Sequence, residues 1–325
     1  MNRVNSDKRG DDKMIIQTGM RTDIPAFYSK WFLNRIKEGY VCVRNPYNPK
    51  QVTKYSLSPE VVDLIAFCTK NPLPMLPFLD ELKPYGQYWF VTITPYGRDI
   101  EPNVPDKETV MEGFKELSDV VGADSMGWRY DPIFVDSVYS IESHLEVFEK
   151  MAATLSGYTK TCIISFIDIY KKVERNFPKA REVSPKDRIL LGKEMIRIAK
   201  QYGMVLKTCA EGDELAPYGA DCTGCMTVRT FETALHANLD VPKKKNNQRN
   251  GQCACLLGVD IGAYDTCGHL CKYCYANTDA VLVKENMRAH DPASPFLLGG
   301  SMPEDVIHEA QQKSWIDGQM RLDIC

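Results

Sequence analysis

The sequence predicts an α/β fold, a (β/α)8 barrel of the TIM type, from three observations. Eight short apolar runs rich in β-branched and aromatic residues are spread along the 325 residues. Helix-like segments, with apolar residues at three- and four-residue spacing, lie between most of these runs. Polar residues follow the runs directly, at the carboxyl ends of strands where barrel enzymes carry their sites. An open, doubly wound sheet is the alternative.

The eight runs are typical of parallel strands that are buried on both faces. In chain order we expect strands at 14–17, 40–44, 64–69, 88–94, 125–129, 162–168, 204–209 and 255–261. The clearest crossover helices are expected at 24–38, 107–121, 141–155 and 186–202. The connections 45–63 and 71–86 are rich in proline, so any helices there are short. We expect one barrel domain over the whole chain, 1–325.

Composition restricts the classes of function. The formal net charge is −3, and this weakly acidic balance argues against a surface that neutralises many phosphates, so we do not expect nucleic acid as a partner. No apolar run approaches the ~20 residues that span a bilayer, and the first residues are polar where a secretory signal is apolar. We therefore expect a cytoplasmic protein with no membrane partner. In that compartment, the 12 cysteines point to metal or redox chemistry rather than to disulfides.

Polar residues at the strand ends supply candidates for substrate contacts or proton transfer. Arg129 is the last residue of the fifth predicted strand and Asp131 comes just after it, and Glu211 follows the seventh. We assign these three residues to the catalytic site on position alone. Arg129 and Asp131 could instead form a structural ion pair, and Asp23, after the first strand, could be the N-cap of a helix.

The sharpest chemical signal is the run CGHLCKYCYAN at 267–277, directly after the eighth strand. Cys267, Cys271 and Cys274 have the spacing C-x3-C-x2-C. Three thiolates on one short loop can ligate three irons of a [4Fe-4S] cluster and leave the fourth iron open. The alternative is a zinc knuckle, completed by His269 or by a more distant ligand.

This run resembles the signature of the radical S-adenosylmethionine (SAM) superfamily, C-x3-C-x-Φ-C with an aromatic residue at Φ, here Tyr273. The resemblance implies that SAM chelates the open iron with Tyr273 near its adenine. One electron from the cluster then cleaves the sulfonium to give methionine and a 5′-deoxyadenosyl radical. It further implies an electron donor such as flavodoxin or ferredoxin, and we expect a small-molecule or peptide substrate. The letters YCYA are also similar to those of spore photoproduct lyase, so a nucleic-acid lesion lyase is one alternative. A non-enzymatic iron–sulfur or zinc protein is the other.

The position of the motif departs from the superfamily, in which it usually follows the first strand. Here Cys267 comes after the eighth strand of a chain of 325 residues. In a closed ring the eighth strand lies beside the first, so the order would be a circular permutation of the usual barrel. On that arrangement Gly19, Arg21 and Thr22 replace the loop that holds the SAM amino group, and 275–325 form a C-terminal helical segment.

A second group of cysteines lies in a loop-rich insertion, 209–255, before the last strand. We expect four of them to bind an auxiliary iron–sulfur cluster or a structural zinc, namely Cys209, Cys222, Cys253 and Cys255. Cys225 is the alternative to Cys222, and unligated thiols are the alternative to a metal. The basic run KKKNNQR at 243–249 is either a solvated loop or a contact for an anionic substrate.

Over nearly its whole length, the chain also resembles a bacterial and archaeal family of unknown function that is noted for a C-terminal cysteine cluster like that of radical SAM proteins. The stretches that carry this resemblance are RTDIPAFY (21–28), VRNPYNPKQV (43–52), TKNP (69–72), WRYDP (128–132), SFID (165–168) and DIGAYDTCGHLCKYCYAN (260–277). This second resemblance implies no substrate.

Overall fold

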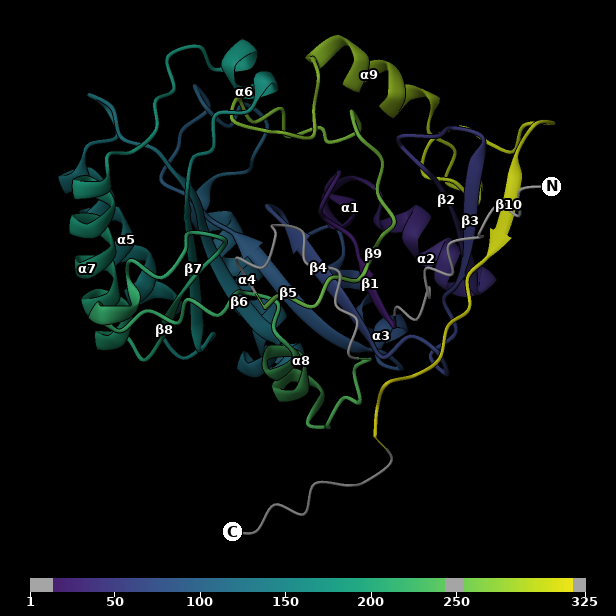
Figure 1. Cartoon of the computed structure of the whole chain (residues 1–325), viewed down its shortest axis with the longest axis horizontal. Helices are drawn as coiled ribbons and strands as arrows, with labels where there is room; N and C mark the ends of the chain where they lie inside the picture. Colours follow the sequence, from purple (N-terminus) through teal and green to yellow (C-terminus); the bar gives the residue numbers. More distant parts are fainter. Residues whose placement is uncertain (1–13, 243–253, 318–325) are drawn as a thin grey trace, which may run out of the picture.

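A seven-stranded parallel sheet forms the body of the protein in a computed structural model that describes residues 14–242 and 254–317 (Figure 1). The strands are β1 (Ile15–Gln17), β4 (Leu64–Thr69), β5 (Gly86–Thr92), β6 (Met126–Ile133), β7 (Thr161–Phe166), β8 (Val205–Thr208) and β9 (Val259–Asp260). Their order across the sheet is β8-β7-β6-β5-β4-β1-β9. When β9 is placed ahead of β1, neighbouring strands follow the chain order, as a circular permutation predicts.

Amphipathic crossover helices cover the outer face of this sheet. Two of the four predicted helices are confirmed at both ends, as α4 (Lys107–Val121) and α5 (Ile141–Leu155). The predicted helix 186–202 is α7 (Pro185–Gln201), and 24–38 is divided at Tyr28 into α1 (Ile24–Phe27) and α2 (Ser29–Glu38). Helices α5 and α7 lie side by side at one edge of the sheet (Figure 1). Large apolar side chains from these helices join the outer core: Trp31, Phe32, Phe114, Leu117, Phe148 and Leu191.

The predicted closure of the barrel is wrong for the described part of the chain, because the sheet is open between β8 and β9. After β8 the chain turns back and runs along the free edge of that strand. The backbone N–H of Asp221 donates to the Leu206 carbonyl at 2.9 Å, and the Thr208 N–H donates to the Asp221 carbonyl at 3.1 Å. These bonds occupy the edge that β9 would need in a closed ring.

The second predicted strand is present as β2 (Tyr40–Arg44), but it belongs to a different sheet. It pairs antiparallel with β3 (Gln51–Ser56), which was not predicted. A short connection allows only an antiparallel neighbour, and here the Asn45 side chain accepts the Tyr47 backbone N–H at 2.9 Å within the turn. Strand β10 (Val306–Glu309) completes this three-stranded sheet.

The C-terminal segment is less helical than predicted. Among its described residues, 275–317, the one α-helix is α9 (Ala280–Ala289), after which the chain extends to β10. The remaining short elements are α3 (Leu79–Leu82), α6 (Lys171–Asn176), α8 (Val228–Leu235) and the 3-10 turns η1 (Leu76–Phe78), η2 (Ala123–Ser125) and η3 (Ala216–Tyr218). None of the helices described in 14–242 and 254–317 is long and apolar enough to cross a membrane.

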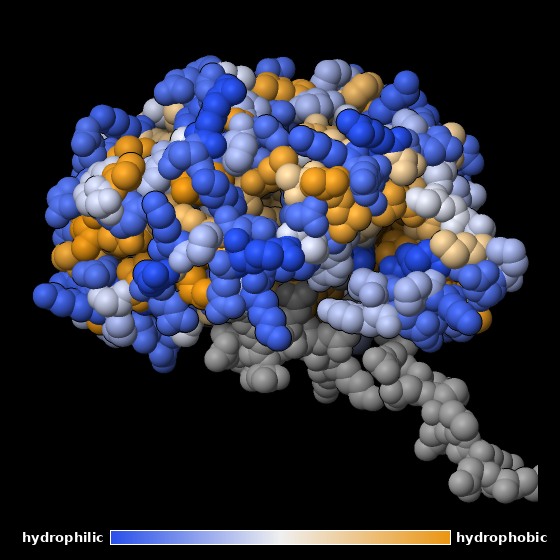
Figure 2. Space-filling view, turned by 90° about the horizontal axis from the view of Figure 1, so that it is seen from above, coloured by the Kyte–Doolittle hydropathy of each residue, from blue (hydrophilic) through white to orange (hydrophobic). Residues whose placement is uncertain are grey.

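The cysteine-rich insertion covers the inner face of the sheet. Side chains of this face form a second core with residues of the insertion and of the chain end: Ile15, Leu64, Tyr88, Phe90, Ile163, Cys225, Met226, Phe231, Cys255, Leu256 and Trp315. Helices α6 and α9 lie at one end of the sheet and α8 at the other (Figure 1). Seen from the α6 and α9 end, hydrophilic and hydrophobic residues are intermingled, without one broad apolar patch (Figure 2). The second core contains Cys225 and Cys255, so these two thiols of the insertion lie against the inner face of the sheet.

Candidate functional site

The cysteine loop lies where the permuted order predicts, beside the loop that follows β1. Strand β9 pairs parallel with β1, with Asp260 opposite Gln17. Beyond the paired strands, the Arg21 guanidinium forms an ion pair with the Asp260 carboxylate, and the Tyr275 hydroxyl donates to the Met20 carbonyl at 2.5 Å. The cysteine loop and the loop after β1 were expected to be neighbours in a closed ring, and here they are neighbours at the edge of an open sheet.

Asp23 attaches the cysteine loop to the loops after β1 and β4. Its Oδ1 accepts the Ala26 N–H at 3.0 Å, which confirms Asp23 as the N-cap of α1. Its Oδ2 accepts the Lys70 N–H at 2.8 Å and lies 2.8 Å from Nε2 of buried His269. The other ring nitrogen of His269 is 3.4 Å from the Asn103 carbonyl oxygen. Because acceptors face both ring nitrogens, this arrangement disfavours His269 as a zinc ligand.

The buried carboxylate of Glu101 holds the cysteine loop in place through Tyr273. Its oxygens accept hydrogen bonds from the hydroxyls of Tyr273 and Thr94 and from the ammonium groups of Lys70 and Lys107. Burial by itself would raise the pKa of Glu101, but the two ammonium groups outweigh it and hold the pKa at about 2. The Tyr273 side chain, which the superfamily signature would place near adenine, is therefore directed into this ionic network.

The three loop thiols are enclosed by protein and are close enough to influence one another. Burial raises the pKa of Cys271 to about 12, against the opposing effect of the Lys70 ammonium, and it also raises the pKa of Cys267 and Cys274. The Ala276 N–H points at the Cys274 sulfur at 3.3 Å. Metal binding by these thiols would therefore release protons and bring charge into a site with a lysine beside it.

No three His, Cys, Asp or Glu side chains within 14–242 and 254–317 are arranged to hold a single metal ion. A multi-iron cluster has a different requirement, because each ligating sulfur binds a different iron and the sulfurs are held further apart. The Ala276 N–H directed at the Cys274 sulfur and the charge of the Lys70 ammonium near the Cys271 thiol would each favour the thiolate form that a cluster ligand takes.

The residues predicted to hold the SAM amino group lie beside the loop, but two of them are already engaged. Gly19 packs on β4, where a Cβ atom would lie 2.2 Å from the Cys68 carbonyl oxygen. The Arg21 guanidinium is bound by Asp260. Thr22 is buried and its hydroxyl has no hydrogen-bond partner within the described residues. Of the three, Thr22 has the side-chain polar group that lacks a hydrogen-bond partner within the described residues.

The structure brings Arg129 and Asp131 together on the inner face, whereas Glu211 is engaged by other residues. The Arg129 Nε lies 3.2 Å from both Asp131 oxygens, and Ser165 donates to Asp131 at 3.3 Å. Glu211 instead accepts the Phe166 N–H at 2.9 Å and pairs with Arg188 at 3.1 Å. Glu211 thus connects β7 to α7.

The second group of cysteines assembles around Cys225, the residue considered as an alternative to Cys222. The Cys225 sulfur lies 3.6 Å from that of Cys209 and 4.0 Å from that of Cys255. The Cys222 thiol contacts the Ala220 carbonyl at 3.9 Å and packs against the outer core. Cys253 and the basic run 243–249 lie outside the described residues.

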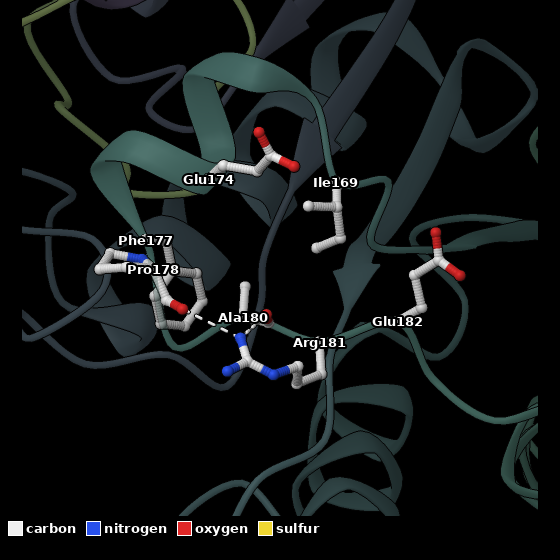
Figure 3. Close-up of a pocket in the computed structure, with 7 residues that line it drawn as sticks. All are labelled: Ile169, Glu174, Phe177, Pro178, Ala180, Arg181 and Glu182. Carbon is white, nitrogen blue, oxygen red and sulfur yellow. Dashed lines mark hydrogen bonds between the residues drawn. The ribbon is translucent and has the colours of Figure 1, made fainter.

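Sequence reasoning missed Glu101, in the long loop after β5, and Lys107, the first residue of α4, because no motif marks either residue. Lys70 had a detectable signal, since it directly follows β4 and polar residues at strand ends are site candidates. A pocket beyond α6 also lies apart from the predicted site residues (Figure 3). There the Arg181 Nη1 donates to the carbonyls of Pro178 at 2.9 Å and Ala180 at 2.7 Å, so this cation is occupied by backbone.

Fold and site together define an open parallel α/β protein with a cysteine-bearing loop at one edge of its sheet. The chain belongs to the family described as a domain of unknown function, DUF1848, whose profile matches residues 15–276. No curated protein matches the chain. The matched range begins at β1 and ends after the cysteine loop, so it contains both groups of cysteines.

Proposed function

We propose that this protein is a radical SAM enzyme whose [4Fe-4S] cluster is held by Cys267, Cys271 and Cys274. The observation that carries the proposal is the placement of these three thiols, one buried and two half-buried, on one loop beside the loop after β1. When bound, such a cluster supplies one electron for cleavage of the SAM sulfonium, which yields methionine and a 5′-deoxyadenosyl radical that abstracts a hydrogen atom.

Two kinds of residue around the cysteine loop support this proposal: residues that fix the loop, and buried polar groups that have no partner among the described residues. Asp23 and Glu101 keep the loop in place through His269 and Tyr273. The hydroxyl of Thr22 is buried without a partner among the described residues, and so is the side-chain oxygen of Asn277. Asn277 also donates to the Cys267 carbonyl at 2.8 Å. Buried polar atoms without partners are costly, so these two atoms suit a polar ligand such as SAM.

Arg129 and Asp131 are the residues that we assign to the substrate. Both side chains are 13% exposed, and both project from the inner face of the sheet near its carboxyl end. A fixed pair of opposite charges suits a polar substrate, which we propose is a small molecule or a peptide, and a flavodoxin or ferredoxin would supply the electron. We assign Glu211 to support of the fold because β7 and α7 already engage it.

The proposal is tested by iron and sulfide analysis of anaerobically purified protein, with EPR of the dithionite-reduced state in the presence and absence of SAM. We expect a cubane signal that SAM alters and accumulation of 5′-deoxyadenosine. The triple variant Cys267→Ala, Cys271→Ala, Cys274→Ala should lose the signal. Cys42→Ala, in β2, is the matched control and should retain it. A wild type with no cluster, or with a cluster that SAM does not perturb, would favour a non-enzymatic metal protein.

A further inference from the structure

We propose that Cys209, Cys225 and Cys255 form a second metal site, separate from the cysteine loop, that binds one thiophilic divalent cation such as Zn²⁺. This proposal does not depend on radical SAM chemistry. The three thiols come from three segments: the end of β8, the turn before α8, and the approach to β9. A shared ion would therefore connect the insertion to both edge strands of the open sheet.

The separations of the sulfurs suit ligands of one ion. Four sulfurs at about 2.3 Å from a tetrahedral zinc lie about 3.8 Å from one another. The Cys225 sulfur is 3.6 Å from that of Cys209 and 4.0 Å from that of Cys255, on either side of this value. These distances are far too long for a disulfide, which requires about 2.05 Å. They also differ from the arrangement in a cubane, where each cysteine binds a different iron.

The backbone around these thiols is shaped for close approach. Gly224 has a φ of +124°, and a Cβ atom there would lie 2.9 Å from the Cys255 sulfur. A larger residue would push apart the two segments that carry Cys225 and Cys255. The Met226 N–H also points at the Cys255 sulfur at 3.5 Å, a contact that favours a thiolate.

A positive charge, which is shared with Asp131, lies beside these thiols. Three thiolates around a divalent cation leave one net negative charge in a buried site, which needs a compensating partner. The Arg129 Nη1 lies 3.5 Å from the Cys225 sulfur, while Nε of the same guanidinium binds Asp131. Arg129 thus provides a cation beside the thiols and ties them to the proposed substrate residues.

The three thiols do not yet form a complete single-ion site as they stand within the described residues. The two thiol contacts share Cys225, so binding of one ion would require the Cys209 and Cys255 side chains to turn towards a common point. The fourth coordination position is left to a ligand other than these three residues. Cys209 and Cys255 each contact Cys225, and binding of an ion would bring the three sulfurs together.

The test uses the full chain with Cys267, Cys271 and Cys274 changed to alanine, so that iron on the loop does not interfere. We expect about one zinc ion per chain after growth with zinc. The further changes Cys209→Ser, Cys225→Ser and Cys255→Ser should each lower zinc content at least about tenfold, because each removes a thiolate ligand. Cys222→Ser is the matched control from the same insertion and should leave the content unchanged.

Cobalt spectroscopy keeps the proposal testable if those serine variants fail to fold. Co²⁺ added to the metal-free triple-alanine protein should give the intense visible bands of tetrahedral thiolate coordination and a sulfur-to-metal charge-transfer band. Absence of these bands would overturn the proposal, as would zinc that survives all three serine changes. Iron with acid-labile sulfide that disappears in the same serine variants would replace the single ion by a cluster.

Discussion

Nε2 of His269 lies 2.8 Å from Oδ2 of Asp23, although 246 residues separate the two in the sequence. Both side chains are buried, at 2% and 7% exposure. Asp23 also caps α1 and binds the backbone of Lys70, so one carboxylate fixes the cysteine loop to the loops after β1 and β4. The position of the three loop thiols therefore depends on a residue near the other end of the chain.

Asp23→Ala should lower the free energy of unfolding by about 3 kcal/mol, since it removes a helix cap and leaves the buried His269 ring without its partner. Urea unfolding followed by circular dichroism measures this loss. Asp279→Ala is the control, because Asp279 caps the exposed α9 through Val281 and Leu282. Loss of a cap alone should cost about 1 kcal/mol. Equal losses in the two variants would show that the bond to His269 contributes nothing.

Glu101→Gln should cost about 3 kcal/mol at neutral pH, because it leaves two buried ammonium groups without their carboxylate. The pKa of Glu101 falls from an ordinary 4.5 to about 2 on folding. The carboxylate therefore stabilises the fold fully above pH 4.5, and that contribution is lost as the pH falls towards 2. The difference in unfolding free energy between wild type and variant should shrink over this range.

Urea unfolding between pH 7 and pH 3 measures this effect of Glu101. Glu146→Gln is the control, because Glu146 forms an exposed pair with Lys150 on α5 and should show no measurable change. A wild-type advantage that stays constant with pH would contradict the assignment.

Lys70→Met should lower the reduction potential of the proposed loop cluster. The Lys70 ammonium favours the ionised form of the Cys271 thiol, and a nearby cation stabilises the more negative, reduced state. We expect a decrease on the order of tens of millivolts in a redox titration followed by EPR. Lys115→Met, on the surface of α4, should leave the potential unchanged. A Lys70 variant that keeps its cluster and its potential would rule out electrostatic tuning by this lysine.

Gly19→Ala should destabilise the fold by about 3 kcal/mol, at the upper end of the cost of overpacking. The added Cβ would lie 2.2 Å from the Cys68 carbonyl oxygen, so β1 and β4 would have to move apart. Thermal unfolding measures the effect. Gly300→Ala is the control, because a Cβ there meets nothing within 4 Å. Similar melting temperatures for the two variants would contradict the close packing at Gly19.

Strands and helices with strong periodicity were predictable because their patterns are local. Helices α4 and α5 begin and end at the predicted residues, and β4 matches its predicted range. Part of the candidate site was predictable from position in the chain. Cys267, Cys271 and Cys274 share one short loop, and the expected strand order placed that loop beside the loop after the first strand. Glu101 was not predictable, because its partners come from segments far apart in the chain: Lys70 after β4, Lys107 at the start of α4 and Tyr273 on the cysteine loop.

Local sequence patterns were sufficient to indicate the α/β class, the parallel strands and the spacing of the loop cysteines, since each depends on residues close together in the chain. The tertiary structure decided that the sheet stays open, because Asp221 pairs with the edge of β8. Tertiary contacts also place β2 in a second sheet and bring the sulfur of Cys225, rather than that of Cys222, close to Cys209. These outcomes depend on contacts between distant segments that compete for the same strand edge or the same space, and no local pattern records which segment prevails.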